Sequence, residues 1–117
     1  MSTEAEKKRR ATLHGILLVK YRMLVAYGQG LLKRRNEQNA AFINVELGRT
    51  DLELKLLEAT MSALRAAVPI QFPTDAQIQK LRDAVARMDT VLSQNAAVEE
   101  VIDAADELID AFPDFQL

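Results

Sequence analysis

Residues 15–32, GILLVKYRMLVAYGQGLL, constrain the fold most, because they are nearly as apolar as a membrane span yet carry charges at Lys20 and Arg22. A membrane-spanning helix needs about 20 consecutive apolar residues, and the uninterrupted apolar runs in this segment are only a few residues long. We therefore expect neither integral membrane insertion nor a secretory signal here. The apolar surface of this segment must be covered by protein or by an external apolar partner.

Drawn as a helix, the segment has two apolar seams, which predicts burial on two faces. The first seam contains Leu13, Leu17, Leu24, Tyr27 and Leu31, and it is widened by Ile16, Val19 and Met23. The second seam contains Leu18, Tyr21, Val25 and Leu32. Lys20 falls inside the first seam, where we expect its long stem to cover apolar surface while its ammonium group reaches water.

A second stretch of the chain, 51–68, repeats this two-seamed pattern, whereas 75–94 and 96–112 each carry a single apolar stripe. One seam of the second stretch contains Leu54, Leu57, Met61, Leu64 and Val68. The other seam contains Leu52, Leu56, Ala59 and Ala63, and Phe42 and Val45 continue it upstream.

Capping residues predict where the helices begin. Thr3, Thr50 and Thr74 are each followed three residues later by Glu or Gln, which is the capping-box pattern. Asn95 is a fourth candidate cap. Gly48 and the prolines Pro69, Pro73 and Pro113 predict the ends. Together these signals predict helices over about 4–47, 51–68, 75–94 and 96–112, with an alternative break inside 33–39, where the sequence is polar on all sides.

The predicted fold class is all-α: one domain over residues 1–117, built as an antiparallel four-helix bundle and assembled into an oligomer. In a small bundle each helix buries one stripe and exposes the rest, so two helices with two seams leave apolar surface to be covered. In the alternative interpretation, the first helix is the central helix of an irregular bundle and its second seam is covered within the chain.

The second seams of the first two helices supply the predicted protein interface. Its residues are Leu18, Tyr21, Val25, Leu32, Phe42, Val45, Leu52 and Leu56. We expect a non-enzymatic interaction or assembly module of adaptor, inhibitor or chaperone type. The expected partner is a second copy of the chain, with a different protein as an alternative.

No residue pattern points to catalysis or to a metal. The chain has no cysteine and a single histidine, His14, which we expect to be structural. It has no Glu-x-x-His pair and no glycine-rich phosphate loop. We therefore expect no enzymatic activity and no cofactor or metal. The lack of cysteine is compatible with the cytoplasmic location that we expect.

Charge is unevenly distributed, since residues 1–35 carry nine Lys and Arg against two Glu, while 96–112 presents an acidic face. We expect basic residues of the first helix to compensate that acidic face. Two basic clusters are candidate anion contacts: Lys7, Lys8, Arg9 and Arg10, and then Lys33, Arg34 and Arg35. They support a less favoured alternative, a nucleic-acid-associated regulator. A peripheral binder of membranes or other apolar surfaces is a further alternative.

Overall fold

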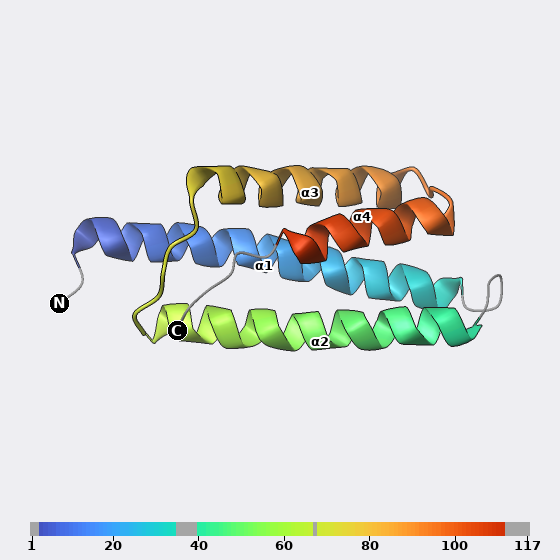
Figure 1. The fold of residues 1–117 in the computed structure, drawn as a ribbon, viewed down its shortest axis with the longest axis horizontal. Helices are drawn as coiled ribbons and strands as arrows, with labels where there is room; N and C mark the ends of the chain where they lie inside the picture. The colour runs from blue at the N-terminus through green and yellow to red at the C-terminus, as the bar shows by residue number, and fades with distance from the viewer. Residues whose placement is uncertain (1–2, 35–39, 67, 112–117) are drawn as a thin grey trace.

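The computed structural model describes residues 3–34, 40–66 and 68–111, which fold into helices without any strand (Figure 1). Helix α1 spans Glu4–Lys33, α2 spans Ala40–Arg65, α3 spans Asp75–Ser93 and α4 spans Val98–Asp110. The predicted all-α class is confirmed for this part of the chain.

Helix α1 is the central element, because it packs against α2 on one side and against α3 and α4 on the other (Figure 1). Its contacts with α2 run in reverse order along the chain: Arg10 bonds to the Leu64 carbonyl and Tyr27 to Glu46. The two helices therefore run in opposite directions. Helix α2 packs mainly against α1, whereas α3 and α4 also pack against each other. This arrangement matches the alternative in which the first helix is central.

The first two predicted helices are divided differently from our main expectation. Helix α1 ends at Lys33, where the Arg34 N–H donates to the carbonyls of Leu31 and Leu32. It therefore does not continue to residue 47, and its end agrees with the alternative of a break inside 33–39. Helix α2 continues through Gly48 and Thr50, where we predicted an end and a new start. Thr50 does not cap a helix: it is buried, and its hydroxyl donates to the Glu46 carbonyl one turn earlier (2.8 Å).

The predicted caps of α1 and α3 are confirmed, and that of α4 is wrong. The Thr3 side chain accepts from the Glu6 N–H, and Thr74 forms a complete capping box with Gln77. Helix α4 instead begins after Ala97 without a side-chain cap. Asn95 has a left-handed backbone (φ 50°), a conformation that asparagine tolerates and that ends the preceding helix. The expected stop at Pro113 lies outside the described residues.

The first seam forms the core as predicted, since Leu13, Leu17, Leu24, Tyr27 and Leu31 are all buried. The expectation for Lys20 is wrong, because this lysine is buried completely among α1, α2 and α4. Its Nζ lies 3.2 Å from Oε1 of Glu53 and donates to the Ile109 carbonyl near the end of α4 (3.3 Å). Two neighbouring helices close over this position, so the stem cannot carry the charge out to water.

Candidate functional site

An exposed apolar stripe lies along α2. Val45, Leu52 and Leu56 expose 66%, 61% and 50% of their surface. Gly48 and Ala59 are also exposed, and Ala63 is half-buried on the same side of the helix. We call this strip of Val45, Gly48, Leu52, Leu56, Ala59 and Ala63 the α2 outer face. Its residues recur at intervals of three or four, so they form one continuous stripe about 27 Å long.

The α1 part of the predicted interface lies elsewhere. Leu18, Tyr21 and Val25 are half-buried, and the Tyr21 hydroxyl donates to the exposed Glu58 carboxylate of α2 (2.7 Å). One turn before Leu18, His14 Nε2 lies 2.8 Å from Nη1 of Arg65. This seam therefore faces α2 of its own chain and is partly covered by it.

The structure thus separates the α1 and α2 parts of the predicted interface, which we had combined into one surface. The side of α2 that faces α1 includes Leu47, which lies beside Gly28. Leu56 follows Leu47 by nine residues, which at 3.6 residues per turn is a rotation of about 180°. The α2 outer face consequently points away from α1. The remaining two predicted residues, Leu32 and Phe42, are exposed at the end of α1 and the start of α2 (50% and 52%).

A polar network fixes α2 against the rest of the molecule. The Tyr27 hydroxyl donates to Oε2 of Glu46 (3.0 Å), and Arg49 pairs with Glu46 (2.8 Å) and with Asp106 of α4. Burial, together with the nearby Glu46 carboxylate, raises the pKa of the Tyr27 hydroxyl above its ordinary value. The network ties α2 to both α1 and α4.

The acidic face of α4 is compensated by residues that we did not select from the sequence. Arg49 of α2 reaches Asp106, and Arg87 of α3 pairs with Glu107 (2.5 Å). We expected the partners to come from α1, and this holds only at the end of α4, where Lys20 donates to the Ile109 carbonyl (3.3 Å) and interacts with the Asp110 carboxylate. The spacing of charges along one helix cannot reveal which neighbouring helix faces it, so nothing in the sequence pattern marked these two arginines.

Two residues of the N-terminal basic cluster contact distant parts of the chain, although the cluster is mostly exposed. The Arg9 guanidinium lies over the Phe72 ring, 4.2 Å from its centroid. Arg10 donates to the carbonyls of Leu64 and Val68 at the end of α2. Lys7 pairs with Glu4 at the surface and Lys8 is exposed. Two of the four candidate anion contacts therefore have structural roles.

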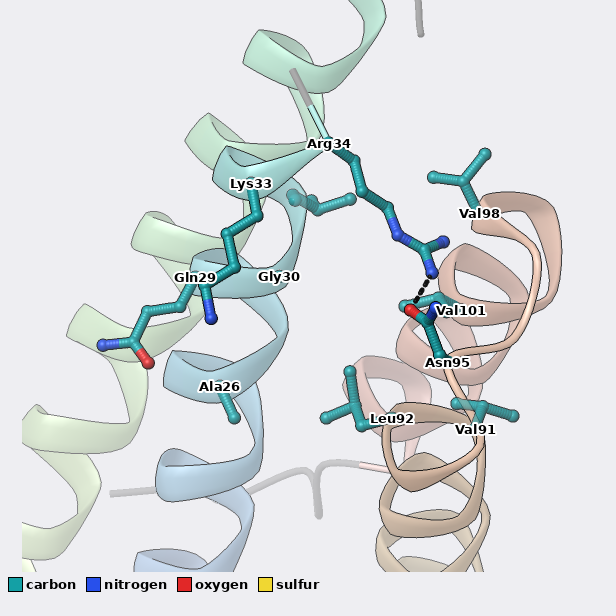
Figure 2. A pocket seen from close by; sticks show the side chains of 11 residues that line it. Ala26, Gln29, Gly30, Lys33, Arg34, Val91, Leu92, Asn95, Val98 and Val101 are labelled. Carbon is teal, nitrogen blue, oxygen red and sulfur yellow. Dashed lines mark hydrogen bonds between the residues drawn. The ribbon is translucent and has the colours of Figure 1, made fainter. Parts of the chain in front are cut away.

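The second basic cluster borders a pocket of about 480 Å3 at the opposite end of α1 (Figure 2). Lys33 and Arg34 line it, and Arg34 reaches across to donate to Oδ1 of Asn95 (2.7 Å). Arg35 lies outside the described residues. The small residues Ala26 and Gly30 leave the space open on the α1 side. The other lining residues are Gln29, Leu31, Val91, Leu92, Val98 and Val101. The two basic clusters are not brought together.

Within residues 3–34, 40–66 and 68–111 there is no group of three or more His, Cys, Asp or Glu side chains that could hold a metal ion. None of the helices in these ranges has the length and apolar character needed to cross a membrane. Comparison with known proteins adds no identification: no protein-family model, curated protein or solved structure matches this chain.

Proposed function

We propose that this chain is a non-enzymatic helical interaction or assembly module, of adaptor, inhibitor or chaperone type, whose antiparallel bundle self-associates. One observation carries the proposal: three large aliphatic side chains of the α2 outer face, Val45, Leu52 and Leu56, are at least half exposed in a row. Since full burial of such a side chain is worth about 1.5–3 kcal/mol, covering what remains exposed would stabilise an assembly by about 1 kcal/mol for each.

The surface proposed here differs in part from the one inferred from the sequence. It is centred on α2, because Leu18, Tyr21 and Val25 of α1 are already partly covered by α2. Leu32 and Phe42 extend the apolar surface near the junction of the two helices. Self-association through the first two helices is retained, with α2 as the main contributor.

The test is the molar mass in solution, measured by light scattering and sedimentation over a range of protein concentrations. We expect the wild-type chain to form a dimer or larger species whose population rises with concentration. The variant Leu52→Glu/Leu56→Glu should be monomeric, because it places two charges in the middle of the outer face.

A matched control is Ala76→Glu/Ala86→Glu, which adds the same two charges to exposed positions of α3. This control should associate like the wild type. A wild-type chain that remains monomeric at about 100 μM, in the concentration range of weak complexes, would refute the proposal. A double Glu variant of α2 that associates unchanged would also refute it.

The nucleic-acid alternative receives less support. A phosphate-binding surface needs cations that are free to approach the backbone of the nucleic acid, whereas Arg9 stacks on Phe72 and Arg10 caps the end of α2. The clusters also lie at opposite ends of α1. We therefore do not advance nucleic-acid binding as a second function.

A further inference from the structure

The α2 outer face changes in side-chain size along its length. Apart from Gly48, its N-terminal and central positions carry the branched side chains of Val45, Leu52 and Leu56, whereas its C-terminal positions carry only Ala59 and Ala63. A surface that tapers in this way packs evenly only against a surface that tapers in the opposite direction, because interfaces of this kind are filled to the density of protein interiors.

The α2 outer face of a second copy, running in the opposite direction, tapers in this way. We infer that the α2 outer face binds the α2 outer face of a second copy, with the two helices antiparallel about a twofold axis near residue 54. This inference rests on the self-association proposed above. In this register Leu52 lies opposite the partner's Leu56, and Val45 lies opposite the partner's Ala63. A parallel pairing would instead place each residue opposite itself, so that large side chains would meet at one end and only alanines at the other.

Gly48 supplies independent support for a close neighbour on this face. It lies in the interior of α2, where glycine is less favourable than alanine. A Cβ built at this position would meet nothing within 4 Å, so packing within the chain does not require glycine. In the antiparallel register Gly48 lies within one residue of the level of the partner's Ala59, and the two small residues let the helix backbones approach closely.

The charges beside the strip favour the same orientation. Asp51 and Lys55 lie on one flank of the outer face, are mostly exposed and pair with each other (3.1 Å). In an antiparallel pair the same flanks of the two helices meet, so Asp51 lies near the partner's Lys55, and Lys55 near the partner's Asp51. In a parallel pair these two flanks would lie on opposite sides of the contact, so Asp51 and Lys55 could not pair with their counterparts on the partner.

The contact area predicts a weak complex. A strip about 27 Å long and about 10 Å wide covers about 270 Å2 on each copy. Stable interfaces cover about 800 Å2 on each partner. We therefore expect a dimer that forms with increasing concentration and exchanges rapidly, rather than a permanent one.

Engineered cysteines test the orientation, since the natural chain has none. The variant Val45→Cys/Ala63→Cys should form a disulfide-linked dimer on mild oxidation, detected by non-reducing electrophoresis and mass spectrometry. Val45→Cys alone should not, because two copies of residue 45 would lie about 27 Å apart along the helix axes. The same separation prevents a disulfide within one α2 helix. Ala86→Cys on α3 measures random collisional cross-linking.

A second variant, Gly48→Leu, tests the close approach. It should reduce dimer formation at least tenfold without lowering the melting temperature of the monomer, because leucine is a better helix former than glycine.

The possible failures can be told apart. A wild-type chain that never dimerises overturns the proposed function and this inference together. Efficient cross-linking of Val45→Cys alone, or full dimerisation of Gly48→Leu, overturns the antiparallel arrangement while self-association stands.

Discussion

Replacing Lys20 by methionine should strongly destabilise the fold. Methionine retains most of the aliphatic length but removes the ammonium group that faces Glu53 and the Ile109 carbonyl. The side chain of Glu53, only 10% exposed, would then remain inside the molecule without this countercharge. Removing one partner of a buried pair costs about 3–5 kcal/mol. That is a large fraction of the 5–15 kcal/mol that stabilises a typical domain.

The pair itself need not be stabilising. Burial lowers the pKa of Lys20 from 10.5 to about 8, even though the Glu53 and Asp110 carboxylates act to raise it. At about 1.4 kcal/mol for each pH unit, the buried charge costs about 3 kcal/mol. The 3.2 Å contact is an ion pair without good hydrogen-bond geometry, since Oε1 of Glu53 accepts no hydrogen bond. The double variant Lys20→Met/Glu53→Leu should therefore recover most of the loss.

The assay is a double-mutant cycle of urea unfolding, followed by far-ultraviolet circular dichroism at pH 7 and at a protein concentration low enough to keep the chain monomeric. We expect similar free energies of unfolding for the wild type and the double variant. That of Lys20→Met should be well below both. A loss of less than about 1 kcal/mol in Lys20→Met, below the range for a broken buried pair, would contradict this role of the Lys20–Glu53 pair. A double variant no more stable than Lys20→Met would contradict it as well.

Three further measurements follow from the structure. Between pH 8 and 10 the unfolded chain binds more protons at Lys20 than the folded chain does, so the free energy of unfolding should rise with pH in that window. This rise should be absent in Lys20→Met. Above pH 10 the raised pKa of Tyr27 should make the free energy of unfolding fall with pH. Gly30→Ala should stabilise the protein by up to about 1 kcal/mol in urea unfolding, because the new Cβ would make only an ordinary contact with Leu92 (3.9 Å), and a loss of stability would show that the helix needs glycine there. Thr74→Ala should cost about 1 kcal/mol in thermal unfolding, because it removes the complete capping box of α3, and an unchanged melting temperature would contradict that role.

The helix periodicity predicted the core of α1 well, whereas local capping patterns were less reliable. The centre of the first seam is buried, because one face of the central helix must be covered in any compact arrangement, whereas Val19 at its edge is 43% exposed. Thr50 and Glu53 have the spacing of a capping box, yet both lie inside α2. A capping-box sequence marks a helix start only where the preceding residues are not helical, and here the helix is continuous. Glu53 serves instead as the buried partner of Lys20.

The candidate site was only partly predictable for a related reason. The sequence fixes the angle between two seams on the same helix, since each residue turns the helix by about 100°. The apolar pattern along one helix does not show which of its seams a neighbouring helix covers. Tyr21 and Leu56 belong to seams with the same pattern, yet Tyr21 bonds to Glu58 across the α1–α2 contact, while Leu56 faces solvent.

The elongated shape affects how self-association must be measured. The molecule measures 53 × 22 × 17 Å and has a radius of gyration of 15.4 Å, against about 13 Å for a compact domain of this length. A rod diffuses more slowly than a sphere of equal mass, so gel filtration calibrated with spherical proteins would assign the monomer too high a mass. A side-by-side dimer would double the mass and thicken the rod without lengthening it. Its elution volume would shift less than the doubled mass implies, and a monomer and a dimer in rapid exchange could pass for a single species on a column.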